Sequence, residues 1–401
     1  PQELLDEVAS GTPLPLDYIA EDFEIPSDWK ASLRWQQDIY GYRFTAQYLY
    51  TKARDGFGWQ LVPHLLDDRA LPTGTAPDGR TIYADLNDLD IPNLTRLNNI
   101  DGAESHVFSV ALGKVYDNGL SFDVSYAYTD AEVVSEGTSS RGISNWRGQY
   151  TVDQNFPDPR TSPFQIEHSW KFNFAYEAQW WSDNITRFDV FGRVFRGDTW
   201  GTTFDVSSSN ALFGRAGLGE SPFDNRPLYI PNPGNDPLVV YGSGFDVDGF
   251  FDYLDENGIP TGGIHAPYSN EVDSWNSIWD FRFQQELGGF SQDSFLGRNK
   301  FKIIFDIENF LNLLNDDWGR VRSGPGFGQN RIVQADLITA ADLAANGVDG
   351  ASALRGDDPR TNCLSAGDCV YRYRDFDADP VEFTNRAASV YELRLTLRYD
   401  F

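Results

Sequence analysis

The sequence predicts an all-β chain, and within that class a transmembrane antiparallel up-and-down β-barrel with long extracellular loops. Three observations support this prediction. Nine stretches alternate apolar and polar residues, the links between them alternate between short and long, and aromatic residues make up 15% of a chain whose mean hydropathy is −0.45. A barrel strand hides its apolar residues at every second position, so such a chain is polar on average.

The alternation is clearest over residues 165–181, where aromatic side chains take the even positions and mostly polar ones take the odd positions. Period two is the mark of a strand whose two faces meet different surroundings. The same pattern predicts nine strands, at residues 29–37, 41–52, 104–116, 119–131, 165–181, 185–196, 277–288, 299–311 and 391–401.

Strand length favours a membrane. Most of the stretches have ten to seventeen residues, whereas strands of soluble sheets usually have about five or six. A tilted membrane strand needs about 9–11 residues to cross the hydrocarbon. Aromatic residues also gather near strand ends, where an interfacial girdle would lie. The examples are Tyr48, Tyr50, Tyr126, Tyr128, Trp180, Trp181 and Tyr399.

The connections give an internal test of the barrel. Transmembrane barrels join their strands by tight periplasmic turns and long extracellular loops in alternation, and structureless loops this long are uncommon in compact soluble domains. The short links lie at 39–41, 117–119, 182–184 and 289–298, and the long ones at 53–103, 132–165, 197–276 and 312–389.

Orientation follows from this alternation. If the last strand descends to the periplasm at Phe401, every long link lies outside the cell and residues 1–28 belong to an earlier outer loop. Bacterial single-chain barrels usually have an even number of strands. Because nine is odd, we expect further strands upstream of this chain.

The polar faces of the strands carry charges of both signs. In lipid, an arginine or lysine at the midplane would cost about 2–4 kcal/mol, so these side chains are expected to face a lumen and to pair across strands. They are Lys171, Glu177, Arg187, Asp189, Arg193, Asp280, Arg282, Lys302, Asp306, Glu308, Arg394 and Arg398.

The net charge is −28, from 60 acidic and 32 basic residues. This balance excludes nucleic acid as a partner, because phosphate binding needs clustered lysine and arginine. Residues 197–276 are the most acidic, with twelve Asp and Glu against two Arg. We interpret them mainly as a solvated surface; bridging by divalent cations and attraction of cationic ligands are the alternatives.

The chain has two cysteines, Cys363 and Cys369, in the last long link. Two cysteines alone do not make a four-ligand zinc site. In an oxidising compartment they would close a small loop, which stabilises a fold by roughly 2 kcal/mol on the chain-entropy model. We therefore predict a disulfide between them.

No catalytic constellation stands out, and we expect the protein not to be an enzyme. The four histidines are far apart in the sequence, and nucleophile elbows, zinc motifs and phosphate-binding loops are absent. Asp375, Asp377 and Asp379 have the spacing of a calcium loop but lack its downstream glycine and terminal glutamate. No cofactor is expected; a structural Ca²⁺ in an outer loop is a weak possibility beside a solvated acidic turn.

Four stretches together resemble the C-terminal part of TonB-dependent outer-membrane receptors, specifically the Oar-like subgroup. They are FEIPSDWK at 23–30, NGLSFDVSYAYTDA at 118–131, RNKFK at 298–302 running into FDIENFLN at 305–312, and the final LRYDF at 397–401. The aromatic-ended last strand is shared by most outer-membrane barrels, whereas the other stretches discriminate more.

The resemblance implies that residues 1–401 form the last nine strands of a barrel of about 22 strands. It implies location in the outer membrane, with a plug domain and N-terminal strands outside this chain. The implied partners are the chain's own plug and N-terminal strands, the TonB-ExbB-ExbD complex, the barrel-assembly machinery, lipopolysaccharide and membrane lipid, and an unknown extracellular ligand.

The last strand resembles the signal that the barrel-assembly machinery recognises. Leu397, Tyr399 and Phe401 would form this signal. A final strand that has not yet closed the barrel leaves backbone groups unpaired, which is costly in lipid. A terminal aromatic residue offers a large apolar anchor with little conformational entropy to lose. The alternative is that Phe401 is one more girdle residue.

The leading functional hypothesis is energised uptake of a bulky or scarce nutrient through TonB. A passive porin and a surface adhesion or assembly barrel are alternatives, and a secreted acidic protein acting on carbohydrate is less favoured. Four tryptophans in or beside the outer loops would either stack on a ligand such as a sugar or pack the loops together: Trp146, Trp200, Trp275 and Trp318.

Overall fold

The computed structural model describes residues 16–65, 73–181, 184–205, 212–214, 226–288, 300–377 and 380–400. The predicted turns at 182–184 and 289–298, and the residues Asp379 and Phe401, lie wholly or partly outside these ranges. The chain is mostly β-structure, with antiparallel pairing throughout its largest sheet, so the predicted all-β class is confirmed at this level.

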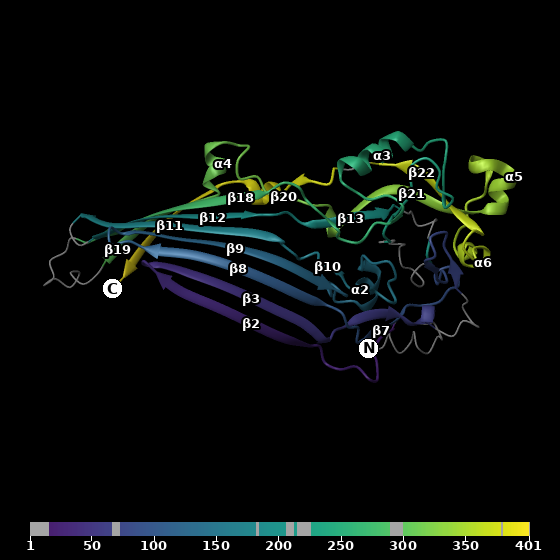
Figure 1. The fold of residues 1–401 in the computed structure, drawn as a ribbon, viewed down its shortest axis with the longest axis horizontal. Coiled ribbons are helices and arrows are strands. Elements are labelled where there is room, and N and C mark those ends of the chain that lie inside the picture. Colours follow the sequence, from purple (N-terminus) through teal and green to yellow (C-terminus); the bar gives the residue numbers. More distant parts are fainter. Residues whose placement is uncertain are drawn as a thin grey trace, which may run out of the picture.

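One long sheet contains all nine predicted strands, in the order in which they occur along the chain (Figure 1). Each strand pairs antiparallel with its sequence neighbour, which is the up-and-down order that the connections predicted. The strands are β2 (Ser27–Ile39), β3 (Tyr42–Asp55), β8 (Glu104–Val115), β9 (Leu120–Val133), β11 (His168–Trp181), β12 (Asn184–Phe195), β18 (Asn276–Leu287), β19 (Lys300–Glu308) and β24 (Glu392–Asp400).

The sheet is open. Among the described residues, its two outermost strands, β2 and β24, are paired on one side only, and the short β10 (Arg160–Thr161) extends it beside β9. One predicted strand is too long: the stretch 299–311 ends as a strand at Glu308. Asn309 takes a left-handed backbone (φ 50°) and is followed by a short helix, α4 (Phe310–Leu314).

Two tight turns are described at the end of the sheet away from the long connections. Between β2 and β3, Tyr40 and Gly41 both have positive φ (51° and 76°), which suits the right-handed twist of a hairpin. After β8, Gly119 (φ 87°) lies so close to β11 that an added Cβ would be 1.9 Å from the carbonyl oxygen of Glu177. Glycine is required at that approach.

The register gives the long sheet one apolar face and one polar face. Val124, Phe172 and Phe281 belong to rows of apolar residues that cross neighbouring strands, and Lys171 and Glu177 lie on the other face. In the row of Phe172, the next position is Gly192, where an added Cβ would lie 2.5 Å from the ring of Trp279. The absent side chain therefore leaves room for that ring.

The long connections are not simple loops, which corrects the expectation from the sequence. They fold together at one end of the long sheet (Figure 1) and contain a second sheet in the order β15-β22-β21-β13-β17. Two of its pairings are parallel, β13 with β21 and β15 with β22. The strands are β13 (Thr199–Phe204), β15 (Val239–Tyr241), β17 (Asn270–Glu271), β21 (Gln329–Thr339) and β22 (Cys369–Phe376).

We call this folded end of the molecule the cap. The largest buried apolar cluster lies there and includes Phe204, Leu228, Phe250 and Tyr371. The cap also holds most of the helices, none of which the sequence analysis expected. They are η1 (Val62–Leu65), α2 (Gly142–Gly148), α3 (Val247–Glu256), η2 (Gly326–Gly328), α5 (Ala340–Gly350) and α6 (Asp358–Asn362); α7 (Arg386–Ser389) precedes the last strand.

Short strands complete the fold. Three of them form a small sheet, β1 (Leu16–Ile19), β7 (Leu94–Asn98) and β4 (Gly58–Leu61), and the rest pair in twos. These pairs are β5 (Gly74–Thr75) with β6 (Thr81–Ile82), β14 (Tyr229–Ile230) with β16 (Gly263–Ile264), and β20 (Arg322–Ser323) with β23 (Phe383–Thr384). Within the described ranges, no helix has both the length and the apolar character to cross a membrane.

Candidate ligand-binding face

Ion pairs connect strands across the polar face of the long sheet. Four side-chain pairs link neighbouring strands: Arg187 with Glu177 (3.4 Å), Arg282 with Asp306 (2.6 Å), Lys302 with Glu286 (3.1 Å) and Arg394 with Glu308 (3.1 Å). Glu286 and Asp306 are largely buried by these contacts. Seven of the twelve charges that the sequence placed on this face therefore pair across strands, as expected: Glu177, Arg187, Arg282, Lys302, Asp306, Glu308 and Arg394.

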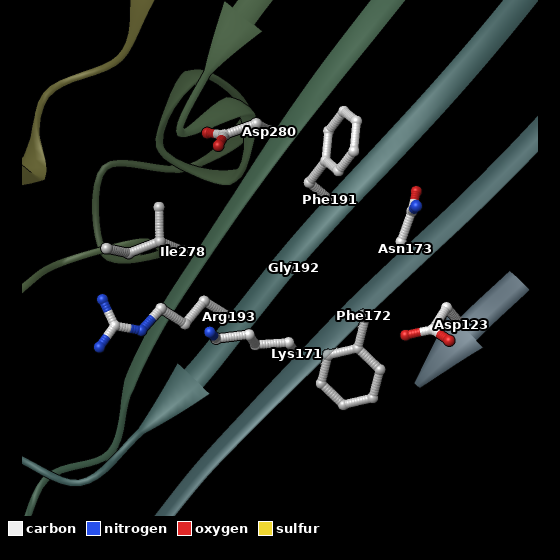
Figure 2. A pocket seen from close by; sticks show the side chains of 9 residues that line it. All are labelled: Asp123, Lys171, Phe172, Asn173, Phe191, Gly192, Arg193, Ile278 and Asp280. Atoms are coloured by element: carbon white, nitrogen blue, oxygen red, sulfur yellow. The ribbon is translucent and has the colours of Figure 1, made fainter. Parts of the chain in front are cut away.

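One register pair on the polar face does not join opposite charges. Lys171 on β11 and Arg193 on β12 are register partners, so two cations lie opposite each other. Neither makes an ion pair to a carboxylate in the described part of the chain; Arg193 lies over the ring of Phe195, 4.1 Å from its centroid. Figure 2 shows both side chains at the edge of a hollow of about 470 Å³, with Asp123 and Asp280 farther along its wall.

A second hollow, of about 450 Å³, lies on the other side of the same two cations. Lys171 and Arg193 line both hollows. The second is otherwise bordered mainly by small and hydroxyl-bearing side chains, and at its far side by Phe164. The two hollows thus adjoin each other at these cations, and we call them together the track.

The track continues into the cap. Phe164 also lines a third hollow, of about 220 Å³, beneath the cap. That hollow shares Thr138, Gly148 and Phe327 with a fourth one, of about 310 Å³. Because each hollow shares lining residues with the next, the four adjoin one another from the cap to the polar sheet face, and we call this series the path.

A separate hollow of about 710 Å³ lies at the edge of the cap, lined by Trp200, His265 and Glu271 among others. The backbone N–H of Thr202 donates to Nδ1 of His265 (3.0 Å), so the imidazole proton lies on Nε2, which donates to Asn270 (2.9 Å). Burial lowers the pKa of His265 below its ordinary value, because desolvation disfavours the charged imidazolium.

Glu271 borders the same hollow under two opposing influences. Burial raises the pKa of its carboxyl, whereas the hydrogen bond that Arg196 donates (3.0 Å) lowers it. Its Oε1 atom and the indole Nε1 of Trp200 are buried without a hydrogen-bond partner among the described residues. The hollow thus presents one acceptor and one donor that a bound molecule could satisfy.

The four tryptophans singled out from the sequence differ in their surroundings. Trp146 is 2% exposed and donates to Asn155 (2.8 Å), so it packs the loops together. Trp200 is also 2% exposed and reaches only the edge of its hollow. Trp275 is about half exposed and stacks on His168 (6.1 Å between ring centroids), and Trp318 is 52% exposed. Two of the four rings therefore remain accessible.

Cys363 and Cys369 are joined by a disulfide within the main core of the cap. It ties the end of α6 to the start of β22, with both sulfur-bearing residues fully buried. The candidate calcium residues are less organised: the Oδ1 atom of Asp375 accepts from the backbone N–H of Phe376. Among the described residues, no group of three or more His, Cys, Asp or Glu is placed to hold a metal ion.

The proposed assembly signal lies on the last strand. Leu397 is 75% exposed on the apolar face, and the ring of Tyr399 packs against Phe301 with centroids 4.7 Å apart. Phe401, the third member, lies outside the described residues.

Sequence reasoning missed the most unusual side chains of the path. Phe327 is 80% exposed and has a left-handed backbone, and the side-chain amide of Gln329 is buried with no hydrogen-bond partner among the described residues. The only sequence signal is the run Pro325-Gly326-Phe327-Gly328, in which an aromatic residue stands between two glycines. Such a run suggests a constrained turn, but it does not reveal that the turn borders two hollows.

No family model matches the chain, and no curated protein matches it significantly.

Proposed function

We propose that the long sheet is part of the wall of an outer-membrane β-barrel, with its apolar face toward lipid and its polar face toward the lumen. We further propose that the chain is the C-terminal part of a TonB-dependent receptor that takes up a bulky or scarce nutrient. The barrel assignment is carried by one observation, the exposed apolar face, and the receptor assignment by the sequence resemblance together with the folded cap.

The exposed apolar side chains extend over the whole width of the long sheet. Its side chains include Trp29 (65% exposed), Leu33 (73%) and Leu395 (67%), which lie on strands at opposite edges of the sheet. Soluble monomers rarely expose a contiguous apolar patch larger than a few hundred Å². Lipid tails would cover such a face without a protein partner, and this is the strongest support for the barrel proposal.

Aromatic residues lie in two belts across the same face. Near the cap, Tyr48 is hydrogen-bonded to His106 (2.7 Å) and Tyr126 to His168 (2.8 Å). Toward the other end of the sheet, the ring of Trp180 packs against Tyr176 of its own strand and against Phe188 of β12. Rings with a polar tip favour the boundary between lipid and water, so two belts support a spanning sheet.

The distance between the belts fits a bilayer. From His168 to Trp180, β11 rises about 40 Å at roughly 3.3 Å per residue. At a tilt of about 45° this corresponds to a height of roughly 28 Å, close to the ~30 Å thickness of the hydrocarbon core.

The polar face supports a lumen. Its charges form ion pairs between strands, and its recessed track reaches the cap. A lumen of this kind would face water or a plug domain. The folded cap favours a receptor that binds its ligand outside the membrane over an open porin, because a large buried core gives the outer end a defined surface.

The proposal is tested on the full-length protein. After cell fractionation, it should be found in the outer membrane and should need detergent for solubility. Uptake of its nutrient should stop when the proton-motive force is collapsed or the TonB protein is removed. Recovery as a soluble protein without detergent would contradict the barrel, whereas uptake that persists without TonB would leave a passive porin.

A further inference from the structure

Phe327 is held in an unfavourable backbone conformation with its ring largely exposed. Its φ and ψ are 57° and 20°, and 80% of the residue is accessible to solvent. An L-residue in this left-handed region is disfavoured by roughly 1–2 kcal/mol. The ring gains little burial in return. What the conformation achieves is to place an aromatic side chain at the border of two hollows of the cap.

Two residues later, Gln329 is a polar residue that is buried, whereas Phe327 is an apolar residue that is exposed. Gln329 is 6% exposed, yet neither its Oε1 nor its Nε2 has a hydrogen-bond partner among the described residues. A buried amide without partners is unfavourable. Gln329 lines the 310 Å³ hollow together with Phe327 and the hydroxyl-bearing residues Ser139 and Ser144. This hollow therefore combines an exposed ring with an uncommitted donor and acceptor.

The carboxylates of the adjoining 220 Å³ hollow already have partners. Glu136 accepts from Arg160 (2.6 Å) and from the Tyr268 hydroxyl (3.2 Å), and Asp198 accepts from the backbone N–H of Gly324 (3.1 Å). Their negative charge is neutralised or engaged in hydrogen bonds. Apart from these two carboxylates and Arg147 of the 310 Å³ hollow, the side chains that line the two hollows are uncharged, which favours a neutral molecule.

We propose that this site binds a neutral oligosaccharide, with one pyranose ring stacked on Phe327 and its hydroxyls hydrogen-bonded to Gln329. A pyranose has an apolar C–H face and an edge of hydroxyls that both donate and accept. An aromatic ring suits the first, and an amide beside serine and threonine hydroxyls suits the second. Phe164, 67% exposed and lining the same 220 Å³ hollow, offers a second ring for a neighbouring sugar unit.

This inference names a ligand class for the proposed receptor, and it rests on that function only for the ligand's onward passage along the track. Binding itself needs neither lipid nor energy. Its test therefore measures binding to purified full-length protein in detergent, separately from membrane topology and from uptake.

The experiment is calorimetric titration with cellohexaose, maltohexaose and xylohexaose. We expect at least one of them to bind with a dissociation constant in the micromolar to millimolar range. Phe327→Ala should weaken that binding at least tenfold, and Gln329→Leu, which keeps the volume but removes the amide, should weaken it several-fold. The matched control is Phe156→Ala, because Phe156 is 59% exposed and lines none of the hollows of the path; it should leave affinity unchanged.

A steric variant gives an independent reading. Gly148 lines both hollows, and a Cβ built on it meets no atom within 4 Å. Gly148→Leu should therefore fill the site without distorting the fold and weaken binding at least tenfold, with an unchanged circular dichroism spectrum.

Two results would overturn the inference: no binding of any of the three oligosaccharides, or equal loss of affinity in Phe156→Ala and Phe327→Ala. Failure here is distinguishable from failure of the proposed function. Protein whose strands behave as membrane strands but which binds none of these sugars refutes only the sugar site, whereas sugar binding by protein that is soluble without detergent refutes only the barrel.

Discussion

Lys171 on β11 and Arg193 on β12 lie directly opposite each other on the polar face of the long sheet (Figure 2). Farther along the same two strands, Glu177 and Arg187 are also register partners and form an ion pair of 3.4 Å. The register therefore places opposite charges together at Glu177 and Arg187, but like charges together at Lys171 and Arg193. Like charges directly opposite each other are destabilising in a sheet, whereas opposite charges contribute roughly 0.2–1 kcal/mol.

This pairing of like charges predicts that Lys171→Glu stabilises the protein. The new carboxylate would face Arg193 and replace a repulsion by an ion pair, raising the free energy of unfolding by about 0.2–1 kcal/mol. Lys171→Gln, which removes only the repulsion, should lie between wild type and Lys171→Glu. The measurement is the denaturant midpoint of the full-length protein in detergent. A midpoint below that of wild type for Lys171→Glu would contradict this explanation.

The faces of β11 predict a pattern of water access. Phe172, Phe174 and Tyr176 should face lipid, and Lys171 and Asn173 the lumen. Single cysteines at these positions, in a background without the native pair, should react with a membrane-impermeant maleimide only at the second set when the protein is in proteoliposomes. Equal labelling at both sets would remove the barrel from consideration.

The long sheet could be predicted from the sequence because its strands have two distinct faces. Period two is strong when every second residue meets a different medium, as it is in β11 with Phe172 beside Lys171 and Asn173. The order of the strands followed from the alternation of short and long links. Only the ends were inexact, as at Asn309, where a left-handed residue stops β19 before the pattern does.

The cap could not be predicted in the same way. Its strand β21 reads Gln-Asn-Arg-Ile-Val-Gln-Ala-Asp-Leu-Ile-Thr, is buried over most of its length and has no regular alternation. Its parallel partner, β13, lies more than a hundred residues earlier in the chain, so no local signal joins them. The path through the cap was missed for the same reason: Phe327 comes from a different long connection than Gly148 and Phe164.

The buried disulfide predicts a specific thiol behaviour. Thiol counting on denatured, non-reduced protein should find no free thiol, because Cys363 and Cys369 are the only cysteines and are bonded to each other. In the native protein the bond should resist mild reductant, since both residues are at most 1% exposed. Cys363→Ser with Cys369→Ser should lower the stability of the cap by about 2 kcal/mol, the loop entropy of so short a closure. Two free thiols would contradict the pairing.

Replacing Phe327 with glycine should raise the stability of the cap while it removes oligosaccharide binding. The backbone at Phe327 is left-handed, and glycine adopts positive φ more readily than any other residue. Phe327→Gly should therefore raise the free energy of unfolding, by up to roughly 1 kcal/mol. Phe327→Ala keeps the strain and should not be stabilising. Thermal unfolding of both variants, followed beside oligosaccharide titration, separates the two effects. A Phe327→Gly protein less stable than wild type would show that the ring stabilises the cap itself, and one less stable than Phe327→Ala would contradict the argument from backbone strain.

His265 gives the cap a pH-dependent stability. Its Nδ1 atom accepts from the backbone N–H of Thr202, its Nε2 donates to Asn270, and its ring lies edge-on to Trp200 with centroids 6.3 Å apart. A second proton would have to sit on Nδ1, facing the Thr202 N–H group. Burial lowers the pKa of the imidazole and keeps it neutral, and the hydrogen bond to Asn270 opposes this effect only in part.

The sign of the effect follows from linkage. In the unfolded chain His265 titrates near its ordinary pKa of 6.5, and in the folded cap it titrates lower. Above pH 6.5 neither state binds the proton, and the stability of the neutral arrangement is fully present. As the pH falls below 6.5, only the unfolded state gains a proton, so stability decreases by up to about 1.4 kcal/mol per pH unit until the folded pKa is reached.

Thermal unfolding of wild type at pH 7.5 and pH 5.5 should show this loss, and His265→Gln, which does not titrate, should lose less over the same interval. Equal losses in the two proteins would mean that another group governs the stability of the cap in this range.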